Sequence, residues 1–341
     1  MKRKLVAGTA LVLAVLVTAF RSQIATQWRF ARFMSARSSS CGSLPEAASP
    51  ALQTLPTRYV ADRWFATPVT QQGDTLVLFH DSGGGGVFAI KPVLERLGLN
   101  PKFVAIEEGD SIFTGGTFPT FRADASIPAP LCAANLEGFG TPATTKELEG
   151  AVGFLGHPWF AGRVWVLDYP GHTMSTYVAT PPARELGAHT IPMTLRDRQK
   201  KNFPRIRVVV AGDTISMLLD TGATSDLSAD AVRVMGAGPP VRASAFVATR
   251  LWNRWRSAHP AWRTIPNGEA SMKADLIEVP TVTIAGYDVG PIWFAKRRDA
   301  VYDNMMSPQM DQPVDASIGG AAFRTFRITM DYPHQRVTFE R

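Results

Sequence analysis

Leu218-Leu219-Asp220-Thr221-Gly222-Ala223-Thr224 carries an aspartate out of an apolar run, residues 208–219, and into a turn. An older-looking copy stands earlier in the chain as Leu78-Phe79-His80-Asp81-Ser82-Gly83-Gly84. In both copies we expect a strand to bring the carboxylate to the end of a sheet. The glycine permits dihedrals or a close backbone approach that a Cβ would obstruct, and the hydroxyl residue can hydrogen-bond locally and hold the turn rigid.

The sequence that follows each turn also repeats. Residues 90–98 and 228–236 predict short helices, each with a start signal (Pro92, Ser228) and a terminal glycine. Gly153-Phe154-Leu155-Gly156 and Ala316-Ser317-Ile318-Gly319 then stand at the same interval before two segments that end in Asp-Tyr-Pro, 164–170 and 327–333. The chain is therefore an internal duplication.

At these residues the chain resembles the aspartic peptidases, specifically the retropepsin-like group with two fused lobes, as in pepsin. Asp-Thr/Ser-Gly, a following short helix, a hydrophobic-hydrophobic-Gly element and a closing Asp-Tyr-Pro mark that family. The resemblance covers residues 60–341 and implies an all-β fold with a few short helices. It implies two similar β-barrel lobes, which we place at 59–180 and 190–341, with Asp81 and Asp220 at the floor of the cleft between them.

The first copy departs from the family pattern just after its turn. It has Gly84-Gly85-Gly86 where the family shows Ala and then Ser or Thr, whereas the second copy keeps Ala223-Thr224. Gly85 cannot make the side-chain hydrogen bond that Thr224 can, so we expect the first turn to be held less firmly. The second copy also has Asp315-Ala316 where Asp-Gly is usual, a minor departure.

The resemblance implies a definite chemistry for the two aspartates. Carboxylates ~3 Å apart cannot both ionise, so the pair would hold one proton. The ionised oxygen would be a general base for a water, and the protonated group would polarise the scissile carbonyl; the apparent pKa values belong to the pair. Ser82 and Thr221 would orient the loops, and the backbone at Gly83 and Gly222 would allow close approach of substrate or water. Neither a cofactor nor a metal is expected.

Other chemistries find little support. The histidines are scattered, without a His-Glu-x-x-His or Cys/His cluster, so we do not expect zinc. A Gly-x-Ser-x-Gly elbow is absent, and the 83–86 glycine run lacks the Lys-Ser/Thr of a phosphate loop. His80 should face away from Asp81 by strand alternation and be structural.

The N-terminal part predicts export. Residues 1–20 combine Lys2-Arg3-Lys4 with an apolar run, the pattern of a signal peptide or a membrane anchor. The run is shorter than the ~20 residues that span a bilayer, which favours a cleaved signal. The body would then lie in the periplasm or cell envelope, or be secreted. Residues 21–58 read as a linker or stalk. Cys41 and Cys132 are the only cysteines, and the sequence leaves their pairing open.

The net charge of +7 belongs to the leader. Seven basic residues precede the first acidic residue, Glu46, and the rest of the chain is balanced. Nucleic-acid binding is therefore not expected.

Three stretches with aromatic residues complete the pattern. Residues 113–118 predict either a flap over the cleft or an ordinary surface hairpin. Residues 251–262 hold three tryptophans and predict either a lid or membrane-surface contact or a helix that covers the second core. Trp159, Phe160 and Trp165 are expected in the core.

The functional prediction is an aspartic endopeptidase with a polypeptide substrate, acting as a monomer. The alternative is a catalytically silent exported β protein that binds peptides or envelope polymers. A third option is that each repeat is a half-site that pairs with another chain.

Overall fold

The computed structural model describes residues 41–99, 102–107, 110–131, 135–139, 148–183, 187–197, 202–236 and 238–341. The predicted leader at 1–20, part of the linker and Cys132 lie outside this range. Cys41 is disulfide-bonded. Within the described residues, no helix is both long and apolar enough to cross a membrane.

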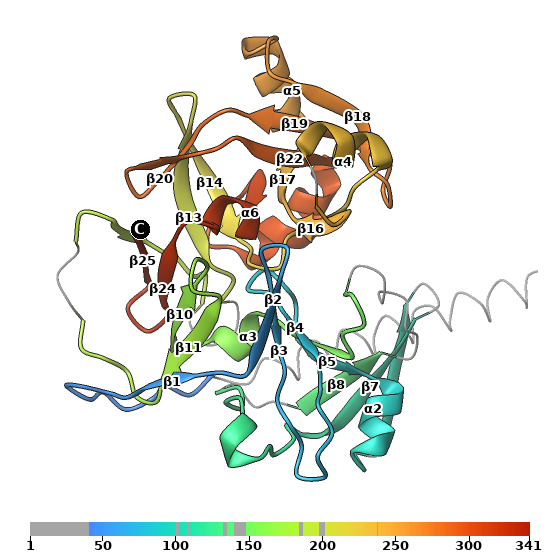
Figure 1. Ribbon diagram of the computed structural model, residues 1–341, viewed down its shortest axis with the longest axis vertical. Helices are drawn as coiled ribbons and strands as arrows, with labels where there is room; N and C mark the ends of the chain where they lie inside the picture. The colour runs from blue at the N-terminus through green and yellow to red at the C-terminus, as the bar shows by residue number, and fades with distance from the viewer. Residues whose placement is uncertain are drawn as a thin grey trace, which may run out of the picture.

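The first half of the chain folds around an eight-stranded sheet (Figure 1). In spatial order its strands are β2 (Thr57–Val60), β3 (Arg63–Ala66), β4 (Leu78–His80), β9 (Gly153–Leu155), β5 (Val87–Ile90), β8 (Asn135–Phe139), β7 (Asp110–Thr117) and β6 (Lys102–Glu107). The helix predicted at 90–98 is α2 (Lys91–Arg96), which Leu97 caps and Gly98 follows with a positive φ of 69°. A second short helix, α3 (His157–Phe160), follows β9 directly.

The second half folds around a nine-stranded sheet, seen at the top of Figure 1. Its order is β18 (Thr264–Glu269), β19 (Ala274–Val279), β22 (Ile292–Arg297), β17 (Ala245–Ala248), β23 (Ala316–Ile318), β14 (Asp213–Leu219), β13 (Arg205–Val210), β20 (Val282–Ile284) and β21 (Tyr287–Val289). The predicted helix after the second turn is α4 (Ala229–Met235). The Ser228 hydroxyl caps it by accepting from the Ala231 N–H at 3.2 Å.

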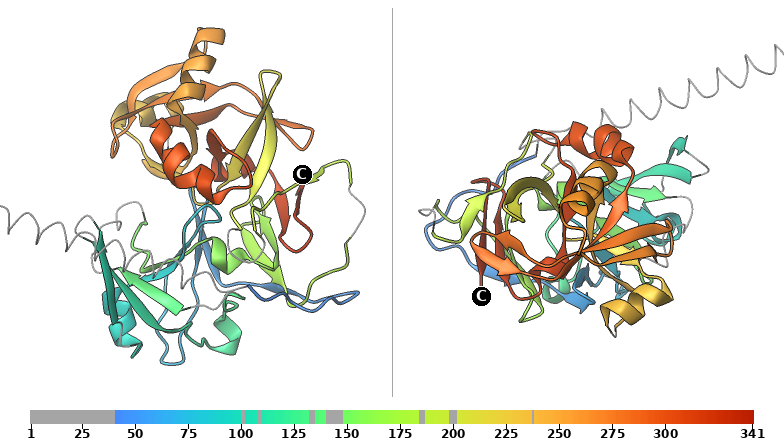
Figure 2. Two further views of the ribbon diagram at one scale, coloured as in Figure 1. Left: turned by 180° about the vertical axis from the view of Figure 1, so that it is seen from behind. Right: turned by 90° about the horizontal axis from the view of Figure 1, so that it is seen from above.

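A six-stranded sheet joins the two halves (Figure 2). Its order is β1 (Leu52–Thr54), β11 (Thr173–Tyr177), β10 (Val164–Asp168), β24 (Arg327–Asp331), β25 (Arg336–Glu340) and β12 (Thr190–Pro192). The closing strands β10 and β24 pair antiparallel, with Val164 opposite Asp331, Val166 opposite Thr329 and Asp168 opposite Arg327. Val166 and Thr329 hold equivalent positions in the two copies and stand opposite each other in this pairing. A pseudo-twofold axis therefore passes between them.

The predicted fold class is confirmed: the protein is all-β with a few short helices, built as two lobes. The boundaries at 59–180 and 190–341 stay a prediction, because strands from both halves share the six-stranded sheet. Trp159, Phe160 and Trp165 are fully buried, as expected for core residues.

Two aromatic stretches now have definite places. Helix α5 (Thr249–Ala258) buries Trp252 and Trp255, and Trp255 meets Phe294 of β22 at 5.3 Å between ring centroids. The stretch is thus the helix that covers the second core, and not a lid. Residues 113–117 lie inside β7, which pairs with β6 on one side and β8 on the other. The stretch is therefore one arm of the antiparallel hairpin that β6 and β7 form, and its role as a flap stays a prediction.

Candidate active site

The two aspartates follow equivalent strands in the two sheets. Asp81 comes directly after β4, which runs parallel to β9, and its N–H donates to the Leu155 carbonyl at 3.0 Å. Asp220 comes directly after β14, which runs parallel to β23, and its N–H donates to the Ile318 carbonyl at 2.9 Å. Each acid is therefore held at a strand end by a neighbouring strand from later in its own copy.

The hydroxyl residues tie one turn to the other. The Ser82 N–H donates to the Thr221 hydroxyl at 3.0 Å, and the Thr221 N–H donates to the Ser82 hydroxyl at 3.1 Å. The Ser82 hydroxyl in turn donates to the Leu219 carbonyl at 2.7 Å. Both hydroxyl residues are fully buried. These reciprocal bonds fix the two turns against each other across the pseudo-twofold axis.

The two predicted glycines lie against the aspartate of the opposite turn. A Cβ on Gly83 would stand 2.6 Å from the Asp220 carboxyl carbon, and a Cβ on Gly222 would stand 2.2 Å from that of Asp81. Real Cβ atoms do not approach so closely. The glycines are needed because the other carboxyl group occupies the space, a reason that the sequence alone could not supply.

The carboxyl groups of Asp81 and Asp220 face each other across the two turns and both line one cleft, Asp220 buried and Asp81 half-buried. Burial raises the pKa of both groups, and the pKa of Asp220 is raised further by the neighbouring charge of Asp81. The Asp81 carboxylate accepts the Gly83 N–H at 2.7 Å, whereas the Gly84 N–H donates to the main-chain carbonyl of Asp81 at 3.2 Å. Because the Gly83 donor stabilises a carboxylate and the pKa of Asp220 is raised the more, the negative charge of the pair is favoured on Asp81 and the shared proton on Asp220.

His80 lies beneath the turns and does not line the cleft. Its Nδ1 contacts the Thr221 hydroxyl at 3.2 Å, and its ring packs against Phe160 at 4.3 Å between centroids. Burial lowers the pKa of His80 from 6.5 to about 3, so the ring is neutral at neutral pH. The side chain has the supporting place that strand alternation suggested.

A cleft of about 450 Å³ opens above the two acids and takes its walls from both halves. Phe79, Phe88 and Phe154 make an apolar wall from the first half. The wall from the second half carries Phe246 and the ion pair of Arg297 with Glu269. Both members of this pair are nearly buried, and Arg297 also stacks over Phe246 at 4.0 Å.

Sequence patterns missed two further polar residues behind Asp220. Ser317 of β23 is buried opposite Leu218, two residues before Asp220, and the buried Tyr302 packs in the same apolar cluster as Leu218. Ser317 occupies the position that Phe154 holds in the first copy, so aligning the two repeats would have shown a polar residue where its counterpart is aromatic. No comparable pattern in the sequence points to Tyr302.

Comparison with known proteins gives a likeness of fold only. No family model matches the chain, and no curated protein sequence matches it. Among solved structures it is similar to an aspartic proteinase from Irpex lacteus, at 11% identity and a TM-score of 0.44, over 85% of this chain and 97% of that chain. We draw no conclusion on activity from so distant a likeness and rely on the geometry of the two turns.

Proposed function

We propose that the protein is an aspartic-type endopeptidase in which Asp81 and Asp220 activate a water against a peptide bond. The observation that carries this proposal is the contact of the two carboxyl groups, buried at the floor of a cleft and unable to ionise together. A buried acid pair without a positive partner is costly to fold, so a functional reason for it is expected.

The donors around each acid suggest how the roles are divided. Asp81, as the carboxylate, removes a proton from water while the water oxygen bonds to the carbonyl carbon. Asp220 gives its proton to the carbonyl oxygen, so that a tetrahedral diol forms. The C–N bond then breaks as Asp81 passes its proton to the nitrogen and the diol returns a proton to Asp220. The products are an acid and an amine, and the pair again holds one proton.

The apolar wall and the volume of the cleft support a polypeptide substrate. Both acids come from one chain, which supports a monomer and makes pairing of half-sites unnecessary. The leader pattern at 1–20 supports export to the periplasm, cell envelope or medium, with membrane attachment if that segment is retained.

Cleavage of a denatured protein at mildly acidic pH tests the proposal. We expect a statine-type inhibitor to block cleavage and Asp81→Asn and Asp220→Asn each to abolish it. Asp230→Asn is a matched control, because Asp230 is an exposed acid on α4 that pairs with Arg233 on the same helix. Peptide binding without cleavage across a pH series would overturn the proposal and favour the silent binding protein.

A further inference from the structure

The outermost hairpin of the second sheet, β18–β19, has a counterpart in the first sheet. In the second sheet β17 pairs parallel with β22, and β22 pairs antiparallel with β19. In the first sheet β5 pairs parallel with β8, and β8 pairs antiparallel with β7. The hairpin β18–β19 thus occupies the place in the second copy that β6–β7 occupies in the first. The duplication has therefore given each half one such hairpin.

The tip of β18–β19 reaches the cleft. Glu269 ends β18 and Ala274 begins β19, and both Glu269 and Met272 line the cleft together with the two aspartates. A bulge between Ile265 and Glu269 interrupts the pairing of the two strands, and such a bulge bends a hairpin and changes the direction of its side chains. Met272 is 66% exposed, so a large apolar side chain stands at the rim of the cleft.

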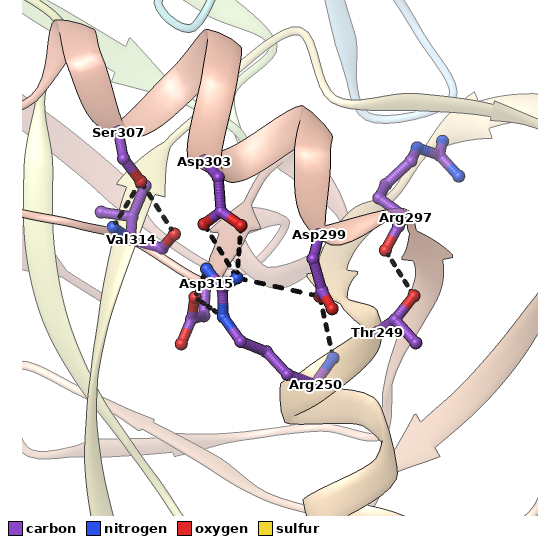
Figure 3. A network of polar contacts seen from close by, with 8 residues as sticks. All are labelled: Thr249, Arg250, Arg297, Asp299, Asp303, Ser307, Val314 and Asp315. Atoms are coloured by element: carbon purple, nitrogen blue, oxygen red, sulfur yellow. Dashed lines mark hydrogen bonds and ion pairs between the residues drawn. The ribbon is translucent and has the colours of Figure 1, made fainter.

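The part of the hairpin next to this tip is firmly held. Arg297 Nη2 donates to Glu269 Oε1 at 2.7 Å, and both side chains are at most 10% exposed. The main-chain carbonyl of Arg297 accepts the Thr249 hydroxyl at 2.9 Å, as Figure 3 shows. The Ala270 N–H donates to the Asp226 carbonyl at 2.7 Å. Because breaking a nearly buried ion pair leaves an uncompensated charge, these contacts give the tip a rigid support.

The cleft wall from the first half is aromatic. The rings of Phe88 and Phe154 lie 6.1 Å apart between centroids, and those of Phe79 and Phe154 lie 5.8 Å apart. All three rings line the same cleft as Met272. A methionine side chain is flexible, adapts to irregular apolar shapes and makes favourable contacts with aromatic rings. An apolar side chain in this cleft would therefore meet aromatic rings from the first half and Met272 from the second.

We propose that Met272 is a specificity-determining residue that contacts the substrate and, opposite the aromatic wall, encloses a bulky apolar side chain close to the cleaved bond. This inference rests on the proposed peptidase function and assigns selectivity to the hairpin of the second half. Burying Met272 against an apolar side chain removes both from water, which favours binding. The contact is the same in the bound substrate and in the transition state, so it acts on KM and not on kcat.

The test uses two peptides that differ only in a phenylalanine or an alanine beside the cleaved bond, with the cleavage site confirmed by mass spectrometry. We expect Met272→Ala to lower kcat/KM for the phenylalanine peptide about tenfold, with kcat within about twofold of wild type. The alanine peptide, which leaves Met272 unburied, should be cleaved as by wild type. Met272→Leu conserves the side-chain volume and should keep kcat/KM for the phenylalanine peptide within about twofold.

Met305 supplies the matched control. It lies in the short helical turn η2 (Val301–Met306) and is 63% exposed, nearly the same as Met272, but it is not among the described residues that line the cleft. Met305→Ala should leave both peptides unaffected. Equal losses on both peptides in Met272→Ala would overturn the inference, as would an unchanged preference for the phenylalanine peptide.

Oxidation of the methionines separates this inference from the peptidase proposal. Hydrogen peroxide converts exposed methionine to its sulfoxide, and mass spectrometry follows Met272 and Met305 separately. With Asp220→Asn, which should leave the phenylalanine peptide intact, we expect saturating peptide to slow oxidation of Met272 severalfold and that of Met305 not at all.

The two proposals fail in different ways in this experiment. If wild type cleaves nothing, the peptidase proposal fails, yet protection of Met272 by the peptide still supports the contact. If the peptide does not bind, or if Met272 is oxidised as fast with the peptide as without it, the inference is overturned even where wild type cleaves.

Discussion

The two copies of the turn have the same backbone arrangement, but they differ in where the large and the small side chains lie around it. In the first, Gly84 leaves room for the Phe154 ring, which would stand 2.2 Å from a Cβ at that position. In the second, Ala223 has a Cβ, and the small Ser317 stands where the ring would be. A small residue in the turn thus goes with a large one in the neighbouring strand, and the reverse. The first acid consequently has an apolar neighbour in that strand, and the second has a polar one.

The largest effect is expected from breaking what the copies share. Gly222→Ala would place a methyl 2.2 Å from the Asp81 carboxyl carbon, and Gly83→Ala would do the same to Asp220 at 2.6 Å. Since the turns are locked by buried hydrogen bonds, we expect each to cost about 3 kcal/mol of unfolding free energy and to abolish cleavage. Denaturant unfolding measures this. Gly85→Ala, with nothing within 4 Å of the added Cβ, should stay within about 0.5 kcal/mol of wild type.

The exchange of volume can be tested by converting the first turn into the second. Gly84→Ala alone should lose about 1–3 kcal/mol, because the Phe154 ring must move. Combined with Phe154→Ser, the same change should cost less than the sum of the single variants, giving a coupling energy of about 1 kcal/mol or more. If the stability losses of the two single variants, measured by thermal unfolding, add up to that of the double variant, the two positions diverged independently.

The unequal acids predict unequal pH dependence of stability. Folding raises the pKa of Asp220 well above its ordinary value near 3.8, so above that pH the unfolded chain binds fewer protons than the folded one. Unfolding free energy therefore falls as pH rises through this window. Asp220→Asn removes that loss and should exceed wild type in stability near neutral pH by about 1–2 kcal/mol.

Calorimetry at several pH values between 4 and neutral checks this. The difference in unfolding free energy between Asp220→Asn and wild type should shrink as the pH falls towards the ordinary pKa of an aspartate. His80 contributes with the opposite sign, because its pKa falls from 6.5 to about 3 on folding, so its stabilisation is lost as the pH drops below 6.5. That contribution is common to both proteins and cancels in the difference. A gap that is constant with pH would contradict the assignment of the shared proton to Asp220.

The smallest effect concerns the residue that the first copy lacks. Thr224 donates its hydroxyl to the Gly222 carbonyl at 2.8 Å and steadies the second turn, whereas Gly85 has no side chain to do so. Gly85→Thr should raise stability by about 0.5–1 kcal/mol through reduced freedom of the unfolded chain and a new local bond. Gly85→Ala isolates the contribution from reduced freedom of the unfolded chain, because alanine cannot make the local bond. If both variants unfold at the same temperature as wild type, the first turn is not held less firmly than the second.

Features that depend on near neighbours were predictable from sequence. The short helices α2 and α4 have local start and stop signals, and Trp165 falls in a repeated apolar strand. Residues 113–117 form one arm of the antiparallel β6–β7 hairpin, but the pairing of β7 with β8 could not be read from a Gly- and Thr-rich stretch. The Arg297–Glu269 pair was missed because its members lie far apart in the chain and no periodic pattern links them.

What the sequence by itself determined is the duplication, since two Asp-Ser/Thr-Gly turns with matching helices and closing strands already require two similar units. Only the tertiary structure decided how those units face each other, because the antiparallel pairing of β10 with β24 and the crossed Ser82–Thr221 bonds connect residues that local propensity does not relate. That facing geometry, and not either turn alone, is what brings Asp81 and Asp220 together.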